Sequence, residues 1–373
     1  MTSGTESSRL TYLDGVRGIA AWNVFIGHFL RSFPIPRNVE TVGSTLADGA
    51  ASVSLFFILS GLVLSYSYLA PGARTRVSIP SFWFRRFVRI VPAFFVVLVV
   101  SELARRTVFV DLSGANEVTE WLRSFWHQPF TIKALALQSI RLFRMFESGT
   151  LLPQGWTLQT ELLLSLVVAF LIPAVREIGL GIVLFTLLAV RVLGAPAYLF
   201  HFTAGILIAR YFISIQGWVR ARSGAFRASA LVVGLALYSF RVPWSRVEPD
   251  NYAEWLVSHP YWIYYVSGSG AAMLLVLVIG SPRLQRLFEK PVARYLGDIS
   301  YSLYLCHFIV LLCLSAPLMH WMGRVDVLSW TLTLVVSTAA TLALATALHR
   351  YVELPCMRVG KRILHYCAAS PSR

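Results

Sequence analysis

Charged side chains are scarce in this sequence. Only 14% of its 373 residues are Asp, Glu, Lys or Arg, about half of the usual globular share, whereas 56% are hydrophobic. Apolar windows close to the bilayer-spanning length of about 20 residues recur along the chain, which leaves no stretch for a large soluble domain. The composition therefore predicts one all-α integral membrane domain over residues 10–360, followed by a short basic cytoplasmic tail over residues 361–373.

Cysteine and the common catalytic motifs are scarce as well. Cys306, Cys313, Cys356 and Cys367 form no CxxC pair, which argues against a zinc site or a disulfide framework. GxSxG, HxxxxD, HExxH, a Walker loop and GxGxxG are all missing. These absences exclude the commonest hydrolase, metalloprotease, nucleotide-hydrolase and Rossmann interpretations. We expect no metal and no permanently bound cofactor.

Acidic residues are the rarer charge type. The chain has 33 Lys and Arg residues against 18 Asp and Glu residues, a formal net charge of +15. Such a charge would suit nucleic acid, but the basic residues gather between alternate apolar segments, as the positive-inside rule describes. We therefore expect a lipid bilayer and no nucleic acid as a partner, with both termini in the cytoplasm. In a bacterium the location would be the inner membrane.

About ten apolar segments are expected to be transmembrane helices. They are residues 16–33, 51–70, 88–104, 156–173, 178–194, 197–213, 226–242, 261–280, 299–318 and 329–349. An amphipathic helix is expected over residues 133–146, KALALQSIRLFRMF, in the outer loop before the fourth span. This region either has a structural role or, with Trp121, Trp126 and His127, forms the outer wall of a substrate cavity.

The stretch LDGVRGIAAWNVFIGHFL places Arg17 and His28 in or beside the first apolar segment. On an α-helix they would lie about 16 Å apart along the axis and nearly on the same face. If Arg17 marks the cytoplasmic boundary, His28 lies near the middle of the hydrocarbon core, where an ionisable side chain needs a partner or a cavity. Two interpretations remain open: a functional imidazole, or a histidine satisfied by a neighbouring helix with Arg17 as a membrane anchor.

Several further polar residues interrupt or border the apolar segments. Ser60 and Gly61 are small residues that would let helices approach closely. Arg85, Arg86 and Arg89 are expected at the cytoplasmic mouth of the third span, where they would anchor the helix or bind phosphate. Glu161 follows Trp156 just inside the fourth span, and a carboxylate there favours a functional role. The stretch LGDISYSLYLCH begins the ninth span with an N-cap signal at Asp298 and Ser300 and continues to Tyr301, Tyr304 and His307, for most of which packing roles suffice.

Taken together, these motifs resemble those of the acyltransferase 3 family of multi-span membrane acyltransferases. The resemblance covers about residues 10–360 and rests on the order of the motifs: Arg17 to His28, Phe56 to Gly61 (FFxxSG), Arg86 to Arg89 (RxxR), Trp156 with Glu161, Gly297 to His307 (GDxSYxLYLxH) and Glu353 in VELP. At the small acidic position often found before the FF pair, this chain has Ser54.

The resemblance implies transfer of an acyl group, usually acetyl, from cytoplasmic acyl-CoA to a hydroxyl group of a sugar, glycolipid, macrolide-like or other acceptor. In that scheme Arg86 and Arg89, assisted by Arg85 and Arg17, would bind the donor phosphates. Neutral His28 would act as general base, and Glu161 could orient His28 or stabilise its protonated form. A covalent acyl-histidine relay is the second mechanism.

Two other classes of protein fit part of the sequence. In a proton-coupled secondary transporter, His28, Glu161 and His307 would relay protons and the arginines would bind an anionic substrate. No inverted repeat supports that alternative, and its basic cluster would lie at the mouth and not at the midplane. A non-catalytic membrane scaffold would leave the shared face of Arg17 and His28 unexplained.

Overall fold

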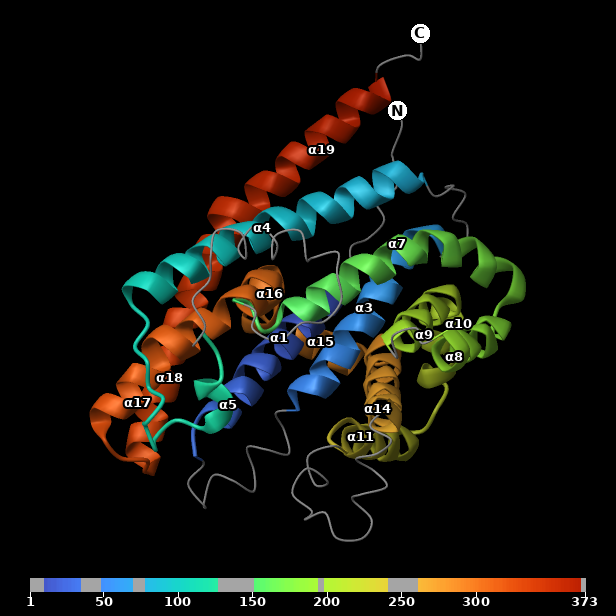
Figure 1. Cartoon of the computed structure of the whole chain (residues 1–373). Coiled ribbons are helices and arrows are strands. Elements are labelled where there is room, and N and C mark those ends of the chain that lie inside the picture. Colours follow the sequence, from blue (N-terminus) through green and yellow to red (C-terminus); the bar gives the residue numbers. More distant parts are fainter. Residues whose placement is uncertain are drawn as a thin grey trace. The chain divides into compact units, whose positions relative to one another are not determined.

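The computed structural model describes residues 10–34, 48–69, 78–126, 151–193, 198–240 and 261–369. Within these ranges every regular element is a helix (Figure 1), which confirms the all-α prediction. The amphipathic helix expected over residues 133–146 lies outside the described residues, as does His127.

The chain divides into two compact units. Unit 1 comprises Met1–Val24, Thr45–Val77 and Leu164–Asp298, and unit 2 comprises Phe25–Ser44, Ser78–Leu163 and Ile299–Arg373. The division points fall inside three helices, which therefore contribute residues to both units. These helices are α1 (Thr11–Ser32), α7 (Gly155–Ile178) and α16 (Pro291–Val310).

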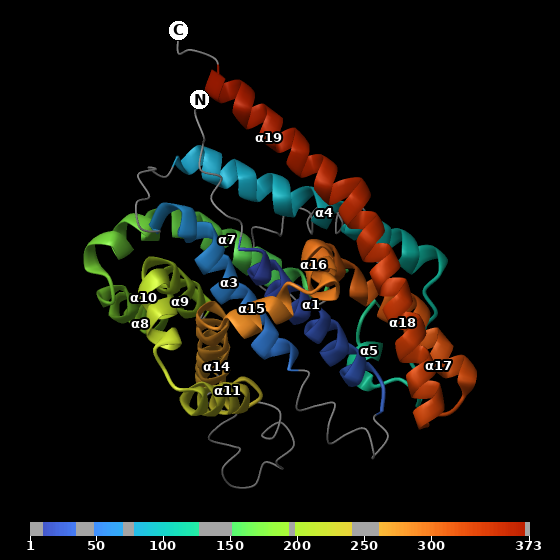
Figure 2. The ribbon, with the colours of Figure 1, turned by 180° about the vertical axis from the view of Figure 1, so that it is seen from behind.

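Unit 1 is organised around α3. Besides the parts of the three shared helices, it contains α3 (Gly49–Leu69), α8 (Gly181–Leu193), α9 (Tyr198–Arg210), α10 (Phe212–Arg220), α11 (Gly224–Tyr238), α14 (Tyr261–Gly280) and α15 (Pro282–Phe288). α3 packs on α9 and α14, and α11 packs on α14 (Figure 2). Buried residues such as Ile58, Leu62 and Leu275 form its apolar core.

Glycines make the contact between α3 and α9 possible. A Cβ atom on Gly61 would lie 2.1 Å from the carbonyl oxygen of Phe202, and one on Gly205 would lie 2.0 Å from that of Ile58. Both distances are far below van der Waals contact, so neither position accepts a side chain without moving a helix. The expectation that Ser60 and Gly61 allow close helix packing is confirmed at Gly61, and Ser60 is buried beside it.

The N-cap prediction for Asp298 and Ser300 is wrong. α16 begins at Pro291, so both residues lie well inside the helix. Proline suits the first helical position because its fixed φ is helical and its missing N–H would have no partner there. Asp298 is exposed, which keeps its carboxylate hydrated, and Ser300 is buried.

Unit 2 holds the longest helices. Besides its parts of the shared helices, it contains α4 (Ile79–Thr107), α5 (Glu120–Arg123), the π-helical η2 (Leu311–Ser315), α17 (Ala316–Met322), α18 (Val327–Leu348), the π-helical η3 (His349–Glu353) and α19 (Leu354–Ala369). α4 packs against α19, and the two helices run beside each other in both views (Figures 1 and 2). Most of the segment expected as a basic tail, residues 361–373, belongs to α19, which ends at Ala369.

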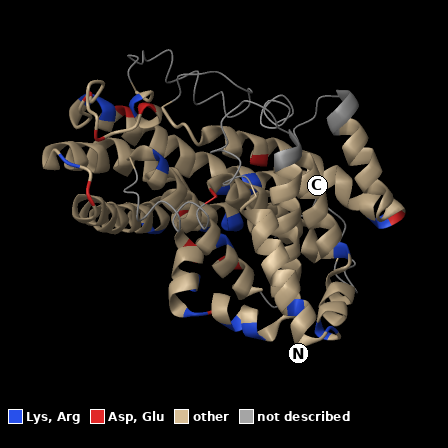
Figure 3. Cartoon of the chain, turned by 90° about the horizontal axis from the view of Figure 1, so that it is seen from below, with Lys and Arg blue, Asp and Glu red and all other residues tan. Residues whose placement is uncertain are grey.

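The helices are those of an integral membrane protein, but among the described residues fewer than ten have the length and composition to span a bilayer. Five described helices pass by length and composition, or up to seven if two bent pairs each count as one span. The pairs are α9 with α10, bent by 76°, and the described part of α14 with α15, bent by 103°. Each of the ten predicted segments overlaps a helix, although α8 and α11 have only 13 and 15 residues. Long stretches of ribbon carry no charged side chain (Figure 3). The sidedness of the termini stays a prediction.

Candidate active site

The centre of the candidate site is a pair of histidines from α1 and α16, both within unit 2. Nδ1 of His28 lies 2.8 Å from Nε2 of His307. The two rings are nearly parallel, at an interplanar angle of 11° and a centroid distance of 5.0 Å. His307 is completely buried, whereas His28 is half-buried. α1 is continuous from Arg17 to His28, so the helical spacing assumed for these two residues is confirmed.

Aromatic side chains surround His28. Its ring stacks on Trp121 of α5 at 5.5 Å and meets Phe308 at 4.9 Å. Phe125 packs edge-on against both Trp121 and Phe308. The alternative in which Trp121 lines the site is therefore supported by a direct contact with the candidate base.

The surroundings of His307 favour one protonation pattern for the pair. Nδ1 of His307 is buried and makes no well-formed hydrogen bond with any described residue. The carbonyl groups of Leu303 and Tyr304, one turn earlier on α16, are the acceptors that interact with this imidazole. A proton on this nitrogen leaves Nε2 of His307 as an acceptor, so Nδ1–H of His28 donates to it. Nε2 of His28 then carries a lone pair, which is the state that a general base requires.

The first turn of α7 supports the tyrosine next to this pair. The hydroxyl groups of Thr157 and Tyr304 lie 2.6 Å apart, and Nε2–H of Gln154 donates to the carbonyl of Leu305 at 2.8 Å. Tyr304, which was expected to have a packing role, therefore holds a buried hydrogen bond as well. Sequence reasoning missed Gln154 and Thr157, although the polar run QGWTLQT before an apolar segment was a visible signal.

Glu161 is paired with Arg86 and not with His28. The Arg86 guanidinium donates to the Glu161 carboxylate, and Arg86 is only 8% exposed. Nearby, the hydroxyl of Tyr301 donates to the carbonyl of Ile90 at 2.7 Å. Among the described residues no contact joins Glu161 to His28, so the expected orientation of the base by Glu161 is not seen; His307 has that position. Arg86 is likewise enclosed, and not part of an open basic mouth.

The other expected site residues differ in exposure. Arg85 is exposed and Arg89 is half-buried, one turn apart on the same side of α4. Trp156 is 38% exposed at the start of α7. Within unit 1, Arg17 lies 4.0 Å from Asp14, one turn earlier on α1.

A buried carboxylate lies in η3. Glu353 is 3% exposed and accepts hydrogen bonds from the Ser302 hydroxyl and from Nδ1 of His349, both at 2.9 Å. The hydroxyl of Tyr301 lies within electrostatic range of both Glu353 and Glu161. Ser302 and His349 carried no motif that would have identified them.

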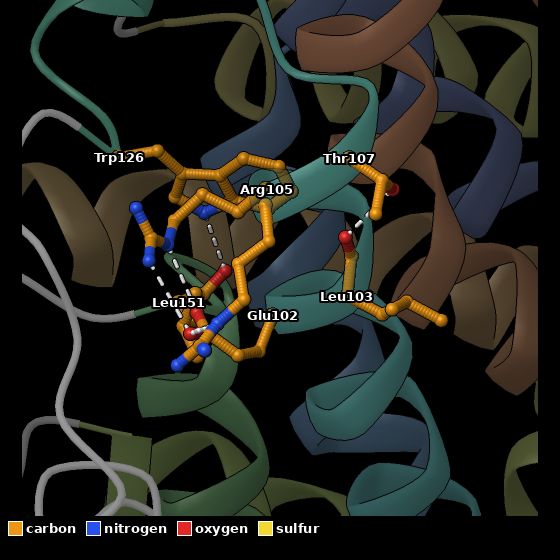
Figure 4. A network of polar contacts seen from close by, with 7 residues as sticks. Glu102, Leu103, Arg105, Thr107, Trp126 and Leu151 are labelled. Carbon is orange, nitrogen blue, oxygen red and sulfur yellow. Dashed lines mark hydrogen bonds and ion pairs between the residues drawn. The ribbon is translucent and has the colours of Figure 1, made fainter.

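A hydrogen bond at Trp126 holds the end of the segment that carries Trp121, close to an ion pair within α4. The Trp126 indole N–H donates to the carbonyl of Leu151 at 2.9 Å, and Trp126 has a left-handed backbone with φ 66° (Figure 4). In the same view the Glu102 carboxylate accepts from Arg105 at 2.9 Å. A non-glycine residue with positive φ costs stability, so burial and the indole hydrogen bond must offset that cost.

The sequence matches the model of the acyltransferase 3 family, described as an acyltransferase domain, over residues 10–350. The chain belongs to this family. It is therefore an acyltransferase, and one that transfers groups other than aminoacyl groups. The transporter and scaffold interpretations find no support in this match.

Curated relatives of this acyltransferase cover nearly its whole length. It is 28% identical to Nodulation protein 10 of Rhizobium leguminosarum bv. viciae, with 95% of both chains aligned. It is 26% identical to Acyltransferase MdmB of Streptomyces mycarofaciens, with 95% of this chain and 93% of that protein aligned. It is 20% identical to a putative O-acetyltransferase of Staphylococcus aureus (strain COL), with 97% of this chain and 60% of the relative aligned. No solved structure matches the sequence.

Proposed function

We propose that this acyltransferase moves an acyl group, acetyl in the first instance, from acyl-CoA to a hydroxyl group of a carbohydrate, glycolipid or macrolide-like acceptor. The observation that carries the proposal is the His28–His307 hydrogen bond, because it leaves Nε2 of His28 as a base. The printed name of the Staphylococcus aureus relative, a putative O-acetyltransferase, supports acetyl as the group and oxygen as the acceptor atom. In a bacterium the enzyme would work in the inner membrane.

His28 acts on both the acceptor and the leaving group. Its Nε2 takes the proton of the acceptor hydroxyl while that oxygen attacks the thioester carbonyl carbon. The tetrahedral intermediate then expels the thiolate, and His28 gives the proton to sulfur. One C–O bond forms, one C–S bond breaks, and the imidazole ends neutral, ready for another cycle.

His307 and the Arg86–Glu161 pair are positioning residues in this scheme. His307 accepts from Nδ1 of His28 and thereby fixes both the tautomer and the direction of Nε2, which is the role that the third member of a hydrolase triad has. Arg86 and Glu161 neutralise each other inside unit 2 and hold α4 against α7. This pair is costly to break because Arg86 is buried and would lose the carboxylate of Glu161, which is itself partly exposed.

The donor phosphates are assigned to basic residues of α4 that are exposed or half-buried. Arg85 and Arg89 present guanidinium groups on one side of α4, and guanidinium forks match phosphate oxygens in pairs. Arg86 supports this helix from within, and Arg17 stays a further candidate for phosphate contact. The pantetheine arm would then carry the thioester from the phosphate site towards His28.

The test uses purified wild-type protein in detergent or nanodiscs with acetyl-CoA and a panel of hydroxyl acceptors. Thiol release that depends on the acceptor, together with an acetylated product, is the expected result. The variant His28→Ala should lose transfer while it still binds acetyl-CoA. Near-wild-type turnover by His28→Ala would overturn the assignment of the base, and silence of the wild type across the panel would overturn the proposed function.

A further inference from the structure

Water is the competitor that any enzyme holding a thioester beside a basic imidazole must exclude. His28 is only four residues from Ser32, the last residue of α1, a rise of about 6 Å along the axis. Arg31, between them, is exposed on the surface of the protein. Because His28 itself is only half-buried, its imidazole would activate water as readily as it activates an acceptor hydroxyl, unless a group covers it.

Trp121 provides such a cover. Its indole stacks on His28 at 5.5 Å with an interplanar angle of 28°, and the guanidinium of Arg31 lies 4.8 Å from the centre of the same indole. Trp121 therefore contacts both the base and the exposed Arg31 side chain near the end of α1. Phe125, at 5.2 Å and edge-on, supports the indole from within the same segment.

The cover is fastened at both ends. On one side, the backbone N–H of Thr119 donates to the carbonyl of Ser32 at 2.9 Å, and the Thr119 hydroxyl donates to that of Arg31 at 2.7 Å. On the other side, the indole N–H of Trp126 donates to the carbonyl of Leu151 (Figure 4). Two anchors flanking a single helical turn fix the position of Trp121 more tightly than packing alone.

We infer that Trp121 is a specificity-determining residue that keeps water from the thioester at His28, so that the acyl group goes to the acceptor hydroxyl and not to water. The inference rests on the proposed function and adds to it the choice between two oxygen nucleophiles. Exclusion of water from a closed site is an established way to suppress hydrolysis of a reactive intermediate.

Without Trp121 over His28, the thioester would be hydrolysed by water. Water would give its proton to Nε2 of His28 while its oxygen attacks the thioester carbon. The C–S bond would then break, and the thiolate would take the proton from His28. The products would be acetate and free coenzyme A in equal amounts, with no acetylated acceptor.

The experiment compares Trp121→Ala with wild type in nanodiscs, with and without acceptor, and measures coenzyme A thiol, acetate and acetylated product separately. We expect the ratio of acetate to acetylated product to rise on the order of tenfold in Trp121→Ala. Trp121→Phe, which keeps an aromatic ring, should return most of the way to the wild-type ratio.

Trp218→Ala is the matched control. Trp218 has similar contacts, with Arg222 at 4.7 Å and Phe226 edge-on at 5.7 Å, but its ring contacts no histidine among the described residues. Its removal should leave the ratio unchanged. If Trp121→Ala loses acetate and acetylated product in parallel, Trp121 has only a structural role and the inference fails. Absence of acceptor-dependent transfer in the wild type would instead overturn the proposed function itself.

Discussion

His28 and His307 lie 279 residues apart in the chain, yet their ring nitrogens are 2.8 Å apart. Each histidine sits on a helix that was identified as apolar, and each satisfies one polar atom of the other. Because an isolated ionisable group inside an apolar bundle is expensive, the pair explains how the fold tolerates two imidazoles there. In the proposed reaction the pair also supplies the base, because the hydrogen bond between the rings uses Nδ1 of His28 and leaves its Nε2 to act on a substrate.

His307 should matter for turnover and not for donor affinity. Replacing it with alanine removes the acceptor for Nδ1–H of His28, so the base loses its fixed tautomer. We expect His307→Ala to lower kcat about 100-fold, within the range for acid–base groups, with little change in KM for acetyl-CoA. His307→Gln, whose amide oxygen can accept the same hydrogen bond, should recover part of the loss. Steady-state kinetics of both variants would decide, and a normal kcat for His307→Ala would contradict the assignment.

Arg86 and Glu161 should behave as a stability unit. We expect Glu161→Gln to lower the free energy of unfolding by about 3 kcal/mol, because the buried Arg86 guanidinium loses this carboxylate, and Arg86→Met to cost less, because Glu161 is partly exposed. The double variant, which removes both charges, should regain much of that loss. Thermal unfolding in detergent of the four proteins forms a double-mutant cycle. Additive losses in the double variant would show that the ion pair does not couple the two positions.

Arg85 and Arg89 should act through the phosphates of the donor. The double variant Arg85→Gln with Arg89→Gln should raise KM for acetyl-CoA on the order of tenfold or more, as expected for lost charge-assisted hydrogen bonds. Its KM for acetyl-pantetheine, a donor without the nucleotide, should stay at the wild-type value. A matched control is Arg283→Gln with Arg286→Gln, which removes two exposed arginines from α15. Equal effects on both donors would move the phosphate site elsewhere.

The apolar helices and the candidate base His28 could be predicted from the sequence, but the side chains that pair with one another could not. His28 stood out because an imidazole in an apolar helix is unusual, but nothing local to either residue indicated that its partner would be His307. Glu161 and Arg86 were both noticed, but nothing in the sequence indicated that they would pair with each other. Such pairings depend on which helix faces cross in three dimensions, and periodicity along one helix carries no information about that.

The boundaries of α16 show a different limit. Asp298 and Ser300 are good N-cap residues, and the apolar run does begin after them, but the helix starts earlier at Pro291. An apolar run predicts the part of a helix that lies in the bilayer, but the helix can begin several residues earlier, as α16 does at Pro291. Gly297, between these helix positions, allows α16 to approach α1 closely, because a Cβ atom on it would lie 2.4 Å from the carbonyl oxygen of Asp14.

Gly61 should tolerate no side chain. We expect Gly61→Ala to destabilise the protein by about 1–3 kcal/mol, because the new Cβ would overlap the Phe202 carbonyl and force α3 and α9 apart. Gly217→Ala on α10 is the control, since a Cβ there would meet no atom within 4 Å. In that exposed helical position alanine should stabilise by about 0.5–1 kcal/mol. Unfolding temperatures of the two variants should therefore move in opposite directions.

The pair formed by Glu117 and His320 should make stability depend on pH. Nδ1 of His320 lies 3.1 Å from the Glu117 carboxylate, and this hydrogen bond lowers the pKa of Glu117 below its ordinary value of 4.5. Because the folded-state pKa is the lower one, the contribution of Glu117 is fully present above the ordinary value and is lost as pH falls through the lowered one. The unfolding temperature of wild type should exceed that of Glu117→Gln near neutral pH, and the difference should vanish in acid. Since Glu117 lies in the segment before Trp121, a difference that persisted unchanged to the lowest pH would show that the ionised carboxylate is not what fastens this segment to α17.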